Sequence, residues 1–269
     1  MKTFGKIFNL CVYFMLYAPL VIMIFFSFNK SKSTSVFFGF SLKWYRELLS
    51  KSDVIQALRN TIVLAVLSSL IATVLGTLAA VGLYKMRNKF LYNTMNTVTN
   101  IPMMNPDIVT GVSLMLLFVF AARLLGLKEY LSFITLLISH ITFNLPYVIL
   151  NVLPKLRQTD DHLYEAALDL GCTPIKAFFK VVFPAIMPGV LSGALMAFTL
   201  SLDDFVISYY TTGADFQTLP LKIFAMTKKT VKPDMYALST LIFVTILILL
   251  IVINILQERS DKKIKGESK

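Results

Sequence analysis

Three acidic residues lie inside or at the edge of long apolar stretches: Asp107, Asp203 and Asp204. An ionised carboxylate near the centre of a bilayer costs on the order of 2.5–3.5 kcal/mol on insertion scales, and such residues mark substrate or ion paths. The stretches that contain them have no Lys or Arg to neutralise them. The pattern therefore favours cation binding within a membrane. The alternative is helix capping, by Asp107 after a proline break and by Asp203 and Asp204 at a helix end.

No motif for hydrolysis or nucleotide binding accompanies these acids. The sequence lacks G-x-x-x-x-G-K-[ST], G-x-S-x-G and H-E-x-x-H. The two histidines, His140 and His162, have no second His or Cys at metal-ligand spacing, and the two cysteines, Cys11 and Cys172, exclude a disulfide framework. We expect no catalytic residue, metal or bound cofactor in this chain. His140 is expected to be a buried hydrogen-bond donor rather than a proton relay.

The composition is typical of a membrane protein. Of 269 residues, 56% are hydrophobic and 15% are charged, whereas a soluble domain is about 25% charged. The net charge is +11, but the basic residues lie between apolar runs and form no stripe with aromatic residues. This indicates contact with anionic lipid and argues against nucleic acid.

Six apolar spans are expected to position the acids, at about 7–28, 61–83, 91–120, 131–153, 185–209 and 235–256. The first is too long for a signal-peptide core and predicts an uncleaved anchor. The third is interrupted by Pro102 and Pro106. Between the first two spans, the apolar spacing over 42–49 predicts an amphipathic helix at the membrane interface, anchored by Trp44 and Tyr45.

Small residues at helical spacing predict close helix contacts in the second and fifth spans. They are Ser68, Ala72, Gly76 and Ala80, and the pair Gly189 and Gly193. The basic residues do not settle the orientation, because with cytoplasmic ends 14 of the 26 Lys and Arg residues lie inside and 12 outside. A basic tail over 257–269 closes the chain, and its charge is typical of disorder.

The polar loop over 154–184 has the clearest local pattern. Asp160 and Asp161 are candidate N-caps of a helix, and Gly171 is suited to the left-handed position that ends one. Thr173 and Pro174 are suited to starting another helix. The loop is therefore expected to contain two short helices joined by a tight glycine turn.

Within this loop, Glu165, Ala166 and Ala167 are followed after three residues by Gly171 and after nine more by the run Val181-Val182-Phe183-Pro184. The spacing resembles the EAA loop of the integral-membrane subunits of ATP-binding-cassette importers, E-A-A-x3-G-x9-I-x-L-P. The resemblance implies that these residues form a coupling helix that docks on a cytoplasmic ATPase. It also implies that the loop, both termini and 85–89 face the cytoplasm.

Further stretches resemble the PotC-type permeases of spermidine/putrescine importers: 105–109, 139–143, 165–171, 198–204 and 219–223. The resemblance implies an all-α, MetI-like type I importer fold with six transmembrane helices, a single permease domain over 1–269, in the cell membrane. It implies a sibling permease, two cytoplasmic ATPase subunits that bind ATP and Mg²⁺, and an external polyamine-binding protein as partners.

A polyamine would complement the three aspartates, which a rise of about 1.5 Å per residue places at a similar level in the outer half of the membrane. Tyr209 and Tyr210 could add cation–π contacts. Alternative substrates in the same superfamily are ferric iron, thiamine or an oxyanion. A different class, an ATP-independent cation carrier or channel, would use the aspartates as ion ligands and need no ATPase.

Overall fold

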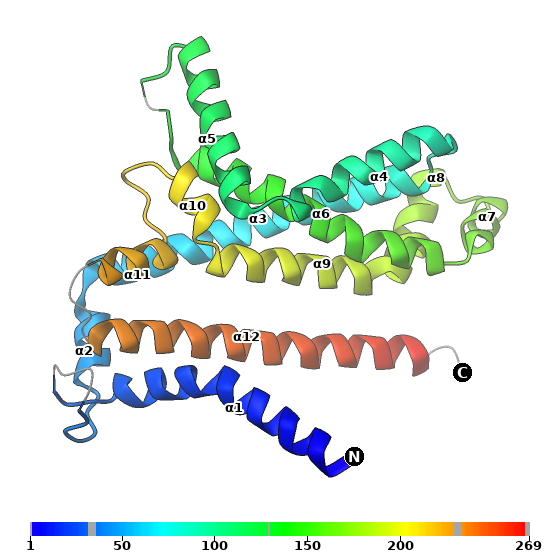
Figure 1. The fold of residues 1–269 in the computed structure, drawn as a ribbon. Coiled ribbons are helices and arrows are strands. Elements are labelled where there is room, and N and C mark those ends of the chain that lie inside the picture. The colour runs from blue at the N-terminus through cyan, green and yellow to red at the C-terminus, as the bar shows by residue number, and fades with distance from the viewer. Residues whose placement is uncertain (1, 32–35, 129, 229–232, 267–269) are drawn as a thin grey trace. The chain divides into compact units, whose positions relative to one another are not determined.

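The computed structural model describes residues 2–31, 36–128, 130–228 and 233–266, and Figure 1 shows their fold. Apart from one isolated antiparallel bridge between Asn29 and Phe40, the regular structure of these residues is helical. The helices are α1 Lys2–Ser27, α2 Lys43–Ser50, α3 Ser52–Tyr84, α4 Lys89–Met104, α5 Asp107–Leu124, α6 Phe133–Gln158, α7 Asp161–Asp169, α8 Pro174–Ala177, the π-helix η1 Phe178–Val182, α9 Phe183–Asp203, α10 Val206–Thr211, α11 Leu219–Thr227 and α12 Pro233–Gly266.

Within the described residues, five stretches are long and apolar enough to cross a membrane, and the apolar part of α12, Pro233–Ile248, is shorter. The all-α prediction is confirmed. The fifth span, expected over 185–209, ends at Asp203 and is followed by the separate helix α10. The third span is broken, as predicted, but at Pro106 alone. That span consists of two helices, α4 and α5, separated by Asn105 and Pro106. Asn105 has extended backbone (ψ 140°), because the ring of a following proline disfavours the helical conformation. Pro102 lies inside α4 without ending it.

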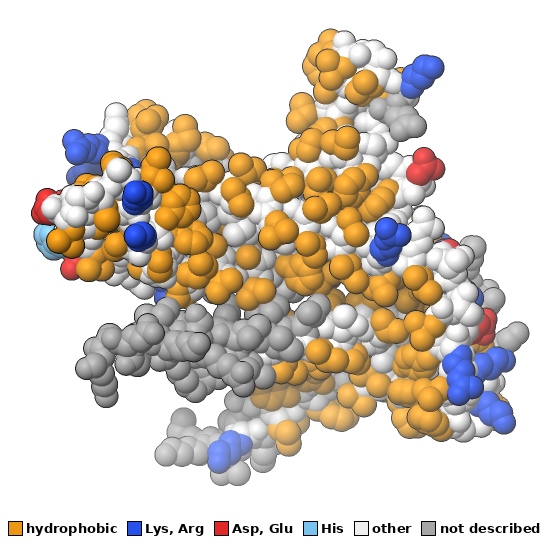
Figure 2. Space-filling view, turned by 180° about the vertical axis from the view of Figure 1, so that it is seen from behind, with side chains coloured by type: hydrophobic (Ala, Val, Ile, Leu, Met, Phe, Trp, Pro, Cys, Tyr) orange, Lys and Arg blue, Asp and Glu red, His pale blue; other side chains and the backbone are white. Residues whose placement is uncertain are grey.

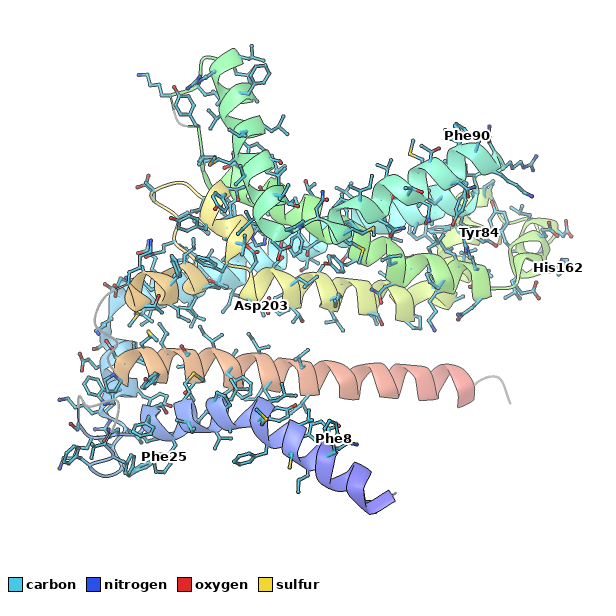
Figure 3. The ribbon with its side chains drawn as sticks, in the orientation of Figure 1. Phe8, Phe25, Tyr84, Phe90, His162 and Asp203 are labelled. Atoms are coloured by element: carbon cyan, nitrogen blue, oxygen red, sulfur yellow. The ribbon has the colours of Figure 1, made fainter. Side chains whose placement is uncertain are left out.

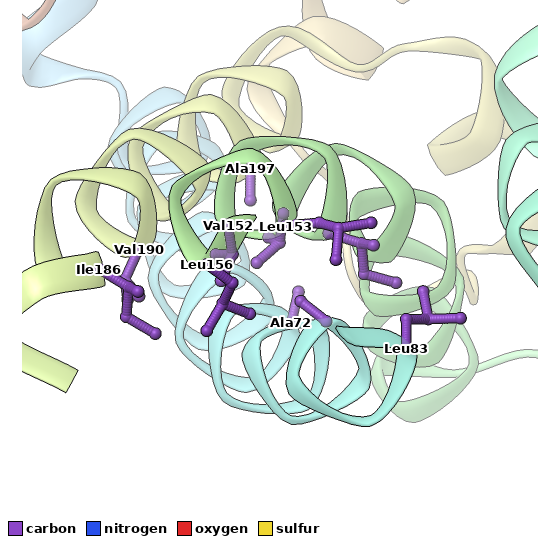
Figure 4. Close-up of a cluster of buried hydrophobic side chains, with 11 residues drawn as sticks. Ala72, Leu83, Val152, Leu153, Leu156, Ile186, Val190 and Ala197 are labelled. Atoms are coloured by element: carbon purple, nitrogen blue, oxygen red, sulfur yellow. The ribbon is translucent and has the colours of Figure 1, made fainter. Parts of the chain in front are cut away.

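The chain forms two compact units, 1–58 with 219–250 (unit 1) and 59–218 with 251–269 (unit 2). In unit 2 the core joins α3, α6 and α9 (Figure 4). A Cβ on Gly76 would lie 2.7 Å from Val148, and one on Gly193 would lie 3.1 Å from the Val148 Cα atom. The predicted small-residue faces are thus confirmed as the surfaces where α3 and α9 approach α6.

In unit 1 the predicted amphipathic helix is α2, but its tryptophan lies elsewhere than expected. Trp44 is 3% exposed, packs in an apolar cluster with Leu48 and donates a hydrogen bond from Nε1 to the Asn29 carbonyl (2.6 Å). The prediction that Trp44 is an interfacial anchor is wrong, because the 3–4 spacing that identifies an amphipathic helix does not reveal which partner its apolar face meets.

The last helix also corrects an expectation. α12 continues to Gly266 and so includes most of the basic tail, whereas 267–269 lie outside the described residues. The Gln, Glu, Arg and Lys residues of this segment are good helix formers, and extending an existing helix avoids the cost of starting one.

The surface of unit 2 suits a bilayer. Hydrophobic side chains cover α5, the arm that projects upward in Figure 2, and only 11% of that helix is buried. Phe90 and Met104 on α4 are 79% and 84% exposed. Exposed apolar area of this extent is rare on a soluble monomer.

Candidate substrate path and coupling surface

Asp107 is the first residue of α5 and is exposed. Pro106 occupies the N-cap position, and the break in the backbone directly precedes the carboxylate. A carboxylate in the first turn interacts favourably with the helix dipole. The predicted helix break is thus present, and it lies directly before an exposed carboxylate.

The two neighbouring acids differ in their surroundings. Asp203 is the last residue of α9 and is exposed, whereas the side chain of Asp204 is only 8% exposed. The Asp204 carboxylate accepts hydrogen bonds from the backbone amides of Ser208 (2.8 Å) and Ile207 (3.3 Å). Asp204 thus acts as a cap, but it is buried and caps the start of α10 rather than the end of the preceding helix, while Asp203 is exposed at the end of α9.

A histidine lies beside the Asp204 carboxylate. His140 on α6 is fully buried, and its Nε2 atom lies 3.0 Å from Ser208 Oγ and 3.5 Å from Asp204 Oδ2. This confirms His140 as a buried hydrogen-bonding residue. This partner of Asp204 was not predicted, because only Lys and Arg were considered as residues that could neutralise the acids.

The buried polar contacts continue from α6 to α3 and α9. Asn144 donates from Nδ2 to Ser201 Oγ (2.8 Å), and Ser201 Oγ lies 2.9 Å from Ser68 Oγ. His140 and Asn144 are four residues apart and so share a face of α6. That spacing was the available sequence signal for a polar face buried in the bundle.

The two tyrosines lie on α10, the helix that Asp204 caps. Tyr209 is 47% exposed, and its ring lies 5.3 Å from the Tyr210 ring in an edge-on arrangement. A Cβ on Gly111 would lie 3.1 Å from Tyr210 Cδ2. The structure thus packs α10 against α5, the helix that begins with Asp107.

The predicted helix, glycine turn and second helix start are present within 154–184, but α6 continues to Gln158 and α8 runs through η1 into α9. Asp160 caps α7 by accepting from the His162 amide (3.0 Å). Gly171 has φ +83°, its amide donates to Leu168 (2.9 Å), and the Cys172 amide donates to Ala167 (3.1 Å). These two bonds form a Schellman ending, which requires the left-handed conformation that glycine adopts without strain.

α7 has an inner and an outer face. Ala167 is buried, whereas the outer face carries exposed side chains at helical spacing: Leu163, Ala166 and Leu170. Leu170 is 86% exposed. Glu165 is also exposed, with Oε2 3.5 Å from His162 Nδ1. An apolar stripe in a polar loop, flanked by an exposed acid, is suited to contact with a protein.

Comparison with known families identifies this architecture. Residues 72–266 match the family described as binding-protein-dependent transport system inner membrane component. The chain belongs to this family. Family membership and the apolar helices together make it a multi-pass membrane protein with a transport role.

Relatives with similar sequences align over most of the chain. The putrescine transport system permease protein PotI of Escherichia coli (strain K12) is 38% identical over 92% of this chain and 88% of its own. The spermidine/putrescine transport system permease protein PotC of the same strain is 39% identical over 97% of both chains. The predicted resemblance to PotC-type permeases is confirmed.

Solved structures of the same fold come from ABC transporters. A chain from the crystal structure of a bacterial ABC transporter involved in the import of alginate superposes with a TM-score of 0.75 and 16% identity, covering 96% of this chain and 95% of that one. A chain from the MetNI methionine ABC transporter has a TM-score of 0.62 and 17% identity, covering 77% and 95%. These likenesses confirm the predicted permease fold of this family.

Proposed function

We propose that this chain is a permease subunit of an ATP-binding-cassette importer for polyamines and forms half of the translocation path. The observation that carries the proposal is the 38–39% identity, over nearly the whole chain, to permeases named for putrescine and spermidine. The aspartates, which suit a cationic substrate, support it independently.

The exposed acids are proposed to meet the substrate. A polyamine consists of ammonium groups joined by methylenes, so it pairs with spaced carboxylates and passes along apolar or aromatic surface. Asp107 and Asp203 are exposed, as is Tyr209, whose ring face can attract a cation. Asp204 is proposed to act in the same path by fixing α10, the helix that carries Tyr209 and Tyr210.

α7 is proposed to be the docking surface for a separate ATPase. Glu165, Ala166, Ala167 and Gly171 would act as one unit, with Gly171 fixing the turn and the outer stripe making the contact. Under this proposal the loop and both chain termini are cytoplasmic, and ATP and Mg²⁺ are bound by the partner ATPase. A sibling permease supplies the other half of the path, and an external binding protein delivers the polyamine.

The proposed cycle is alternating access. The loaded binding protein docks on the outer side, ATP binding closes the two ATPase subunits, and their movement is passed to α7. The path then opens outward, accepts the cation beside Asp203 and Asp107, and reopens inward after hydrolysis.

Competition uptake tests the substrate. The complete complex in vesicles is supplied with labelled putrescine, with unlabelled spermidine, thiamine, ferric iron or an oxyanion as competitor. We expect spermidine to compete and the others to have no effect. Competition by the oxyanion, or uptake of iron or thiamine in place of putrescine, would reject the polyamine assignment.

A further inference from the structure

The segment 154–184, the proposed coupling loop, is contacted once by the turn between α3 and α4 and once by α4 itself. Lys85, directly after α3, places Nζ 5.2 Å from the ring centre of Tyr164 on α7. Arg157, in the last turn of α6, places its guanidinium carbon 5.4 Å from the ring centre of Tyr92 on α4 and donates a hydrogen bond to the Tyr92 hydroxyl. Each link pairs a cation with an aromatic ring, which attracts it through the ring quadrupole.

A cavity of about 240 Å³ lies behind α7. Both Lys85 and Tyr164 line it, together with Val81 and Tyr84 of α3 and Phe178 of η1. Because close packing is what normally makes neighbouring helices move together, a cavity at this place leaves α7 weakly tied to α3. The Lys85–Tyr164 contact bridges that space. Figure 3 shows Tyr84 and His162 at this same end of unit 2.

The turn between α3 and α4 is suited to making α4 move together with the end of α3. It is short, with α3 ending at Tyr84 and α4 starting at Lys89, and Asn88 Oδ1 caps α4 by accepting from the amides of Phe90 (3.0 Å) and Leu91 (3.3 Å). α4 then runs for 16 residues, or about 24 Å at 1.5 Å per residue. It ends at the break that precedes Asp107.

We propose that Tyr164 and Arg157 are positioning residues that make α4 follow the coupling loop, so that movement of α7 reaches the break before Asp107. The inference rests on the proposed function, because it takes α7 as the element that an ATPase moves. Along the chain, α7 is connected to α6 on one side and, through α8 and η1, to α9 on the other. The two cation–aromatic links add α4, and thereby the helix break beside a substrate-facing acid, to the moving parts.

Tyr164→Ala tests the first link in the complete complex reconstituted in vesicles. The measured quantities are ATPase co-purification, ATP hydrolysis, and putrescine imported per ATP hydrolysed. We expect unchanged co-purification and about two- to fivefold less putrescine per ATP, the range that loss of an exposed cation–π contact can produce. Tyr164→Phe, which keeps the ring face, is expected to import as much per ATP as the unchanged chain.

Lys85→Ala tests the same contact from an exposed side chain, where folding is not at risk. We expect the same decrease in putrescine imported per ATP as for Tyr164→Ala, and no further decrease when both changes are combined. Arg87→Ala is the matched control, because Arg87 is an exposed cation in the same turn with no ring contact among the described residues. Tyr92→Leu is expected to lower import per ATP through the second link.

Two results would overturn the inference. One is unchanged import per ATP in assembled Lys85→Ala or Tyr164→Ala complexes. The other is an equal loss in Arg87→Ala, which would assign the effect to charge alone. Failure of the proposed function is distinguishable, because in that case the ATPase would not co-purify with the unchanged chain.

Discussion

The two ends of unit 2 hold the residues proposed to be functional in opposite ways. At one end, Asp204 is enclosed by His140 and the start of α10, and its carboxylate accepts hydrogen bonds from two backbone amides. At the other end, α7 is followed by the exposed Leu170, and its exposed Glu165 is among the residues that line the cavity between α7 and α3. Figure 3 shows Asp203 and His162 toward these opposite ends.

This difference separates two tasks. A substrate path has to keep its geometry, and a buried network of hydrogen-bonded side chains favours one arrangement. A coupling element has to meet a partner and move, which exposed side chains and sparse packing allow. Changes at the first end are therefore expected to affect stability or substrate affinity, and changes at the second to affect the use of ATP.

The largest effect is expected from Gly171→Pro. Proline fixes φ near −65° and has no amide hydrogen, whereas Gly171 has φ +83° and donates to Leu168. We expect putrescine uptake by the complex to be abolished. Gly126→Pro is the matched control, since Gly126 also has positive φ (+66°) and follows the end of a helix, α5. Wild-type uptake by a normally assembled Gly171→Pro complex would remove the coupling role.

Asp204→Ala tests the buried end through stability. It leaves His140 without its carboxylate and the α10 amides without their cap, and losing one partner of a buried pair costs about 3 kcal/mol. We expect a clearly lower midpoint of thermal unfolding for the purified complex in detergent. Asp203→Ala, at an exposed carboxylate, is expected to stay within about 0.5 kcal/mol. Equal destabilisation by both changes would contradict the distinction between these neighbours.

Asp203→Asn tests the exposed acid through substrate affinity. The amide keeps the shape and removes the charge, so we expect the KM for putrescine uptake to rise about three- to tenfold, equivalent to about 0.7–1.4 kcal/mol. Assembly and ATP binding by the partner should be unchanged. Uptake kinetics identical to the unchanged chain would exclude Asp203 from the substrate path.

The smallest effect is expected at Tyr209. Tyr209→Leu removes the aromatic face while keeping an apolar side chain, and a partly exposed cation–π contact contributes about 0.5–1 kcal/mol. We expect the KM for putrescine to rise about two- to fivefold, and Tyr209→Phe to restore it. If the phenylalanine variant behaves like the leucine variant, the hydroxyl rather than the ring face is what matters.

The short helices of 154–184, the proposed coupling loop, could be predicted from sequence because the residues that start and end them act locally. Asp160, Gly171 and Thr173 act on backbone groups within a few residues, so their order in the sequence is enough to define the two short helices. The small-residue faces of α3 and α9 were also predictable, since spacing alone places them on one side of a helix.

The contacts that define the acidic end could not be predicted in this way. The His140–Asp204 pair joins α6 to the start of α10, and nothing near either residue in the sequence reveals the other. The same is true of Trp44, whose burial depends on the Asn29 carbonyl and a cluster formed by distant helices. The break of the third span at Pro106 was predicted, whereas the sequence did not reveal that α4 would accommodate Pro102.

The most direct test of the central claim, that a separate ATPase drives polyamine import through this chain, is putrescine uptake into vesicles with ATP inside. It compares the complete complex, a complex whose ATPase cannot hydrolyse ATP, and the permease subunits alone. The account predicts uptake only by the first. Uptake by the permease subunits alone, driven by a cation gradient, would contradict it and identify an independent carrier.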